Sequence, residues 1–276
     1  MSNPNPVPPK SGRLLLIPNT LDFGCVGGGE PHDASLPAPL PDLRESLPLG
    51  AITAAAGLRH WIAENARTTR AFLKRVADIV PLSTPLQEQD IQVLPRPPKG
   101  GHKPSSQDES RQIAALLAPA LAGHDVGLIS EAGLPGVADP GAAVVLAAHQ
   151  AGIPVLPLSG PSSLVLALAA SGLHGQSFAF VGYLPVNAQE RAQRIRELEQ
   201  ASRKGRQTQL VIETPYRNTA LWQALLQHLQ GNTLLSASCG LTLPQGWSRT
   251  DTVARWRQHP LTLPDDIPTV FSWLAF

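Results

Sequence analysis

The sequence is poor in the residues that metal sites, disulfide frameworks and membrane spans require. Its 276 residues include only two cysteines, Cys25 and Cys239, far apart and without a paired spacing. Histidines such as His102, His149 and His174 also lack metal-ligand spacing, so we expect them to face solvent or cap helices. No stretch of about 18 uninterrupted apolar residues occurs, and the first ten residues lack a signal-peptide core. These absences predict a soluble cytoplasmic protein without a disulfide, a metal or a membrane span.

Charged and aromatic residues are also scarce. Charged residues make up 16% of the chain and aromatic residues 5%, and the formal net charge is +1. A protein that contacts many nucleic-acid phosphates usually carries a basic surplus or a dense basic stripe. The weak basic character therefore mildly favours a small-molecule substrate over RNA.

Aliphatic residues are abundant, and strand patterns followed by helix patterns recur along the chain, which is typical of α/β layering. We expect a disordered tail up to residue 11, an N-terminal α/β domain over residues 12–158 and a C-terminal α/β domain over residues 159–276. The expected strands are 13–17, 61–63, 91–94, 126–129, 153–157, 178–182, 209–213, 233–238 and 269–275. The expected helices are 66–77, 108–121, 140–150, 164–170, 188–203 and 219–229.

Two bent loops are the most informative feature of the sequence. The apolar run 126–129 suits a parallel strand covered on both faces, and the loop Ser-Glu-Ala-Gly-Leu-Pro-Gly-Val-Ala-Asp-Pro-Gly follows it over residues 130–141. Asp139 followed by proline is typical of a helix start, and the loop glycines permit close backbone approaches. A second strand leads into the turn Ser-Gly-Pro-Ser-Ser at 159–163. We expect the two strands to be neighbours in the sheet, so that both loops meet at one ligand site.

These segments, together with Phe-Ala-Phe-Val-Gly-Tyr-Leu-Pro at 178–185, resemble the tetrapyrrole methylase superfamily. The likeness is greatest to the bacterial 16S ribosomal RNA 2′-O-ribose cytidine methyltransferases, because residues 62–69 resemble their AED-T-R-T segment and residues 210–217 their FYE-S/A-P-H-R segment. The resemblance covers roughly residues 13–276. It implies two α/β domains with S-adenosylmethionine bound in the cleft between them, a homodimer, no metal, and ribosomal RNA as the acceptor.

The motif match also implies which residues contact the cofactor. They are Ser130, Ala132, Gly133, Asp139, Ser162, Ser163, Glu213, Thr214, Gly240, Leu241 and Thr242. Structural alternatives stay open for several of them. Asp139 and Ser162 suit the N-cap of a helix, the glycines of the first loop suit its turns, and Glu213 could pair with Arg217 one turn later.

Glu64 and Arg67 are the candidate catalytic residues. A ribose hydroxyl is a weak acid, so its methylation benefits from a base or from groups that orient the oxygen. The chain departs from the subfamily here, since Asn65 replaces the second acid and Ala66 replaces a threonine. Pairing of Glu64 with Arg67 or Arg70 is the structural alternative.

The loop after the first expected strand departs further from the family pattern. The subfamily has Pro-Thr-Pro-Ile-Gly-Asn-Leu there, whereas this chain has Pro18 and Thr20 and then a glycine run at 27–29. No Gly-Lys-Ser/Thr follows the glycines, which argues against a phosphate-binding loop. The altered loop keeps two alternatives to an RNA enzyme open: a methyltransferase of a small, tetrapyrrole-like molecule, and a protein that binds S-adenosylmethionine without catalysis.

Overall fold

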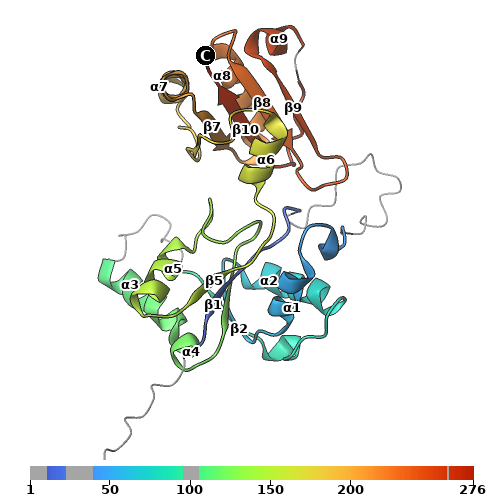
Figure 1. Ribbon diagram of the computed structural model, residues 1–276, viewed down its shortest axis with the longest axis vertical. Helices are drawn as coiled ribbons and strands as arrows, with labels where there is room; N and C mark the ends of the chain where they lie inside the picture. The colour runs from blue at the N-terminus through green and yellow to red at the C-terminus, as the bar shows by residue number, and fades with distance from the viewer. Residues whose placement is uncertain (1–10, 23–39, 96–105, 260) are drawn as a thin grey trace, which may run out of the picture. The chain divides into compact units, whose positions relative to one another are not determined.

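The computed structural model describes residues 11–22, 40–95, 106–259 and 261–276 (Figure 1). These residues form two compact units. The first holds the described residues among 11–22 and 42–161, and the second holds residues 40–41 and the described part of 162–276. The expected tail, Cys25, His102 and the glycine run at 27–29 lie outside the described residues.

The sheet of the first unit has five parallel strands in the order β3-β2-β4-β1-β5. β4 is buried along its length between two parallel neighbours, as its continuous apolar run predicts. The expectation that the strands before the two bent loops are neighbours is wrong, because β1 pairs with both and lies between them. The strands are β1 (Leu14–Ile17), β2 (His60–Ala63), β3 (Asp90–Val93), β4 (Val126–Ile129) and β5 (Val155–Pro157).

Helices cover both faces of this sheet, with α1 and α2 on one side and α3 and α5 on the other (Figure 1). The alternation along β1 fits this layering: Leu15 and Ile17 pack with residues of α1 and α2, while Leu14 packs with residues of α3, α4 and α5. The helices are α1 (Leu49–Ala56), α2 (Ala66–Ala77), α3 (Ser106–Leu116), α4 (Ala118–Leu121) and α5 (Ala142–Gln150).

Two helix predictions in this unit need correction. The helix expected over 108–121 is interrupted at Leu117, because Pro119 lacks the N–H that a continuous helix would need and stands instead in the first turn of α4. The helix expected from Pro140 begins at Ala142. Its N-cap is Gly141, with a φ of 129° that favours glycine.

The second unit has a mixed sheet in the order β6-β7-β10-β8-β9. β6 and β7 pair parallel, and β10 runs antiparallel to both β7 and β8. The carboxyl ends of β6, β7 and β8 therefore lie along one edge of this sheet. The strands are β6 (Phe178–Phe180), β7 (Thr208–Ile212), β8 (Leu234–Cys239), β9 (Trp247–Thr252) and β10 (Thr269–Leu274).

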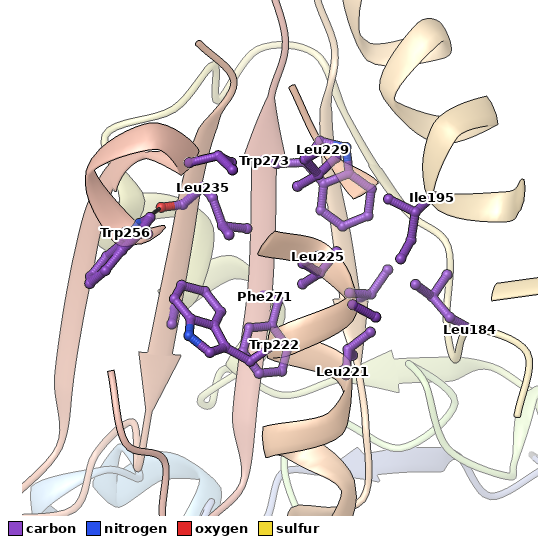
Figure 2. Packing of buried hydrophobic residues seen from close by; sticks show 14 of the residues in the cluster. Leu184, Ile195, Leu221, Trp222, Leu225, Leu229, Leu235, Trp256, Phe271 and Trp273 are labelled. Atoms are coloured by element: carbon purple, nitrogen blue, oxygen red, sulfur yellow. Dashed lines mark hydrogen bonds between the residues drawn. The ribbon is translucent and has the colours of Figure 1, made fainter. Parts of the chain in front are cut away.

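A tryptophan-rich core lies on one face of the second sheet (Figure 2). Trp222 of α8 contacts Trp256 of α9 edge-on, with ring centroids 5.2 Å apart, and stacks on Phe271 of β10 at 5.8 Å. Trp256 donates its indole N–H to the carbonyl of Leu235 at 2.8 Å.

α6 packs on the opposite face of this sheet through Leu164 and other apolar residues. The helices are α6 (Ser163–Ser171), α7 (Ala188–Gly205), α8 (Asn218–His228) and α9 (Val253–Gln258). Among the described residues no helix combines the length and apolarity needed to cross a membrane.

Candidate cofactor site

The first-unit candidates gather at the carboxyl edge of the parallel sheet. Because parallel strands end at a common edge, the segments that follow β1, β2, β4 and β5 all emerge there. Glu64 follows β2 directly and Ser130 follows β4 directly. The sequence motif named both positions, and the topology explains why residues so far apart in sequence reach one place.

Asn19, which the sequence argument did not single out, ties the loop after β1 to the loop after β4. Its backbone forms a two-way bridge with Gly133, with N···O distances of 2.9 and 3.2 Å. Its side-chain amide donates to the carbonyls of Ser130 at 3.1 Å and Glu131 at 3.0 Å. The side chain is buried, so these bonds replace water and fix the two loops against each other.

Glycines let the three loops approach closely. Gly133 has a φ of 67°, and a Cβ built on it would lie 3.3 Å from Leu21 and 3.5 Å from the carbonyl oxygen of Pro161. A Cβ on Gly160 would lie 2.1 Å from the Cβ of Pro18, a distance that cannot occur without separating the loops after β1 and β5. The bent loops therefore converge even though β1 lies between their strands.

Ser130 and Ala132 are buried at this edge of the sheet, and we call these two residues the floor of the site. The Ser130 hydroxyl donates to the carbonyl of Ala132 at 3.0 Å, and both residues are buried. This bond closes the turn that leads to Gly133. Turn formation alone could select these residues, so their contact with a ligand stays a prediction.

Three carboxylates lie around this floor. The backbone N–H of Glu131 donates to Oε2 of Glu64 at 3.2 Å. Oε1 of Glu131 accepts from the side-chain amide of Asn65 at 3.1 Å and from the Thr68 hydroxyl at 3.4 Å. Glu131 was not among the predicted residues, although the loop motif contains it. The third carboxylate is Asp139.

Asp139 is not the N-cap of α5, contrary to the structural alternative given by the sequence. It precedes the first helical residue by three positions, and its carboxyl group is half-buried near Ser130 and Glu64. Burial, and secondarily the negative charge of Glu64, raise its pKa to about 6, while a hydrogen bond with Ser130 opposes the rise. Its charge therefore changes near neutral pH, which favours a functional role.

A pocket of about 290 Å³ adjoins Asp139 within the first unit. Apolar side chains from the end of β3 and from α3 line it together with the first turn of α5, and the carboxyl of Asp139 is its acidic group. The lining residues are Leu94, Pro95, Ile113, Asp139, Pro140, Gly141, Ala142, Ala143 and Val144.

Arg67 lies in the exposed first turn of α2, where its backbone N–H donates to the side chain of Asn65 at 2.9 Å. Asn65 is the N-cap of α2, a role that the acid of the family pattern would fill equally well. The guanidinium of Arg70 donates to the carbonyl of Ala66 at 3.4 Å. Pairing of Glu64 with either arginine stays a prediction, as does catalysis by Glu64.

The remaining predicted residues belong to the second unit. Ser162 is the N-cap residue of α6 but makes no capping bond with its side chain, and Ser163 begins the helix. Glu213 is buried and pairs with Arg217 at 3.2 Å, which confirms the structural alternative for that residue. Thr214 donates its N–H to Glu213 at 2.8 Å.

Gly240, Leu241 and Thr242 follow β8 at the same sheet edge as Glu213. Gly240 has a φ of 60° and Thr242 a φ of 69°, so both adopt the left-handed region within one tight turn. The N–H of Gly240 donates to the carbonyl of Pro268 at 3.0 Å. Leu241 is partly buried against the α6 side of the core, so its side chain has a packing role. Within the described residues, no group of three or more histidine, cysteine or acidic side chains could hold a metal.

Comparison with known proteins decides the family. The profile of the tetrapyrrole (corrin/porphyrin) methylases matches residues 51–245. The chain belongs to this family. The match includes the loops after β4 and β5, and it confirms the resemblance inferred from the sequence motifs.

Individual relatives add detail. A ribosomal RNA small subunit methyltransferase I from Vibrio cholerae is 36% identical over 124 residues, which cover 45% of this chain and 42% of that protein. A protein of the same name from Mesorhizobium japonicum is 35% identical over 144 residues, covering 52% and 48% respectively. The chain thus matches less than half of the length of either relative.

A solved structure supports the fold alone. A conserved hypothetical protein from Aeropyrum pernix K1 superposes with a TM-score of 0.54 at 17% identity, over 96% of this chain and 85% of that one. The α/β fold class expected from the sequence is confirmed by the sheets of the two units and by this likeness.

Proposed function

We propose that the chain is an S-adenosylmethionine-dependent methyltransferase of the tetrapyrrole methylase family that modifies ribosomal RNA. Family membership supports methyl transfer, and the names of the two relatives support ribosomal RNA as the acceptor. The observation that carries the proposal is the convergence of the Asn19, Gly133 and Pro161 loops beside the carboxylates of Glu64, Glu131 and Asp139.

The residues at this edge fit such a cofactor. S-adenosylmethionine carries a sulfonium and an ammonium group, and carboxylates at a sheet edge favour cations by simple electrostatics. Left-handed glycines leave the backbone of the loops accessible to a ligand. When bound, the cofactor supplies an already activated methyl group, so the protein must chiefly align the acceptor and exclude water.

Glu64 is the proposed base, and Arg67 is proposed to orient the acceptor. Glu64 lies at the end of β2 with its carboxylate held by the N–H of Glu131. A base in this position would accept the proton of a ribose 2′-hydroxyl as the oxygen attacks. In the second unit, Glu213, Thr214 and the Gly240–Thr242 turn are proposed cofactor contacts, together with Ser162 and Ser163. We further propose a homodimer that acts in the cytoplasm, which sedimentation analysis and fractionation would test.

Methyl transfer from radiolabelled S-adenosylmethionine tests the proposal. The acceptor should be total ribosomal RNA from a strain that lacks this protein, with RNA from the parent strain as the control. We expect label in the small-subunit RNA of the deletion strain and little in the parent RNA, whose site is already methylated. Label that appears only in a small-molecule fraction would overturn the RNA assignment, and cofactor binding without transfer to any extract would overturn catalysis.

A further inference from the structure

Both tyrosines of the chain lie at the carboxyl edge of the second-unit sheet. The sequence contains only two, Tyr183 and Tyr216. Tyr183 follows β6 and is 58% exposed, and Tyr216 follows β7 and is 72% exposed. A single exposed tyrosine needs no explanation. Two that share one edge, in a chain whose tryptophans are mostly buried, place two exposed aromatic rings at the same edge as the predicted site residues.

Neighbouring strands hold Tyr183 near the predicted site residue Glu213. β6 and β7 pair parallel with Phe180 opposite Leu210. The pairing continues past the strand end with a shift of one residue, because the N–H of Ile212 donates to the carbonyl of Gly182 at 3.2 Å and not to that of Val181. Adjacent strands lie about 4.8 Å apart. The shifted pairing therefore places Tyr183 opposite Ile212, one residue before Glu213.

Tyr216 lies three residues after Glu213, on a short turn whose ends are held by hydrogen bonds and an ion pair. Pro215–Arg217 forms a short 3-10 helix immediately after Thr214. The Glu213 side chain, only 2% exposed, anchors it by pairing with Arg217 at 3.2 Å and by accepting the N–H of Thr214 at 2.8 Å. The ring of Tyr216 is thus exposed on a turn whose ends are fixed, so little conformational entropy opposes contact with a flat ligand.

We propose that Tyr183 and Tyr216 form an aromatic platform that stacks on a planar nucleobase. This inference rests on the proposed function, which supplies two sources of such a ring: the adenine of S-adenosylmethionine and an unpaired base of the acceptor RNA. Exposed aromatic rings bind unstacked bases through their faces, with losses of about 1–3 kcal/mol per base on alanine substitution. By about 1.4 kcal/mol for each factor of ten, this is roughly a 5- to 150-fold loss of affinity.

Four variants test the platform: Tyr183→Ala, Tyr216→Ala, Tyr183→Phe and Tyr216→Phe. The matched control is Phe276→Ala, because Phe276 is also an exposed aromatic residue, 64% exposed, at the chain end. Calorimetry would measure the Kd for S-adenosylmethionine, and steady-state kinetics the KM for small-subunit ribosomal RNA. Thermal unfolding would verify that each variant is folded, which the exposure of both rings predicts.

We expect each alanine variant to raise either the Kd for the cofactor or the KM for RNA by about 5- to 150-fold. The same constants for the phenylalanine variants and for Phe276→Ala should stay within about twofold of the wild type, because each of these variants keeps both stacking rings. A raised Kd for the cofactor identifies adenine as the stacked ring. A raised KM for RNA with unchanged cofactor affinity identifies an acceptor base. If the wild type binds cofactor and methylates RNA while both alanine variants match it, the platform is overturned and the proposed function stands. If the wild type binds no cofactor, the proposed function itself has failed.

Discussion

At the scale of single residues, Gly133 and Gly152 offer a matched test of the site. Both have left-handed φ values, 67° and 69°. Nothing lies within 4 Å of a Cβ on Gly152, whereas a Cβ on Gly133 would contact Leu21 and the Pro161 carbonyl. Gly133→Ala and Gly152→Ala should each cost about 1–2 kcal/mol of folding free energy, because alanine is strained in that region.

Only Gly133→Ala should lower cofactor affinity, because only that Cβ meets the neighbouring site loops, where it crowds Leu21 at 3.3 Å and touches the Pro161 carbonyl at 3.5 Å. Chemical denaturation and calorimetry on the two variants measure the two effects. Equal affinity of both variants for S-adenosylmethionine would remove the Gly133 loop from the site.

Asp139 should make folding stability depend on pH. Its pKa in the folded protein, about 6, is higher than the ordinary value of 3.8, so folding favours the protonated form. The stabilising contribution is complete below pH of about 4 and is lost as pH rises through about 6. Asp139→Asn lacks this loss and should therefore be more stable than the wild type at pH 7.

Melting temperatures measured from pH 4 to pH 8 would check this, and the gap between variant and wild type should close toward pH 4. Glu64→Gln is the companion variant. It removes the charge that helps to raise the Asp139 pKa, so the pH dependence should shift to lower pH. A gap that does not change with pH would rule out an Asp139 pKa near 6.

At the scale of elements, a buried carboxylate fastens α7 to the turn between α8 and β8. Glu199 is 4% exposed and accepts hydrogen bonds from the backbone N–H of Gln230 at 2.7 Å and from the Thr233 hydroxyl. Glu199→Ala leaves both donors unsatisfied and should cost about 2–4 kcal/mol. Glu197→Ala, on the same helix, removes an exposed pair with Arg194 and an exposed hydrogen bond from Gln193, and should cost less than about 0.5 kcal/mol.

Urea unfolding followed by tryptophan fluorescence suits this comparison, because every tryptophan except Trp61 belongs to the second unit. The chain has two compact units, so the transition should be assigned to one of them before a free energy is extracted. Similar costs for the two variants would contradict the anchoring role of Glu199.

Local sequence patterns predicted elements well where one signal dominated. The apolar run of β4 and the amphipathic repeat of α2 correspond to elements with the expected bounds, 126–129 and 66–77. β9 was not predicted because its residues, Trp247–Thr252, are mostly polar and contain no apolar run. This strand lies at the antiparallel edge of its sheet, where polar residues are tolerated. α1 was also not predicted, because it is only eight residues long and begins after Pro48 without a side-chain cap.

The site residues, too, were predicted only where one local motif identified them. Motif similarity named Ser130, Gly133 and Asp139, which the structure brings together. It could not name Asn19, whose partners lie more than a hundred positions away and depend on β1 pairing with β4. The Asp-Pro pattern suggested a capping alternative for Asp139, whereas the N-cap of α5 is Gly141, whose positive φ favours glycine. Strand order, which one sequence does not reveal, decides such contacts.

At the scale of the whole molecule, the balance of charge limits how the protein can hold RNA. The chain has 22 basic and 21 acidic residues. Such a chain should neutralise few phosphates, about three, and each contact with a single strand contributes about 0.7 to the salt slope. We therefore expect log Kd for ribosomal RNA to rise with log salt concentration at a slope of about 2, a loss of roughly 15-fold between 50 and 200 mM salt.

Filter binding at several salt concentrations measures this slope, and S-adenosylmethionine binding under the same conditions supplies the reference for general ionic effects. A slope above about 5 would mean that many cations of the chain converge on the RNA despite the low net charge. A slope near zero would mean that the RNA phosphates contribute nothing to binding. In that case the weak basic character would favour the small-molecule acceptor, since an RNA enzyme without phosphate contacts has no means to position its substrate.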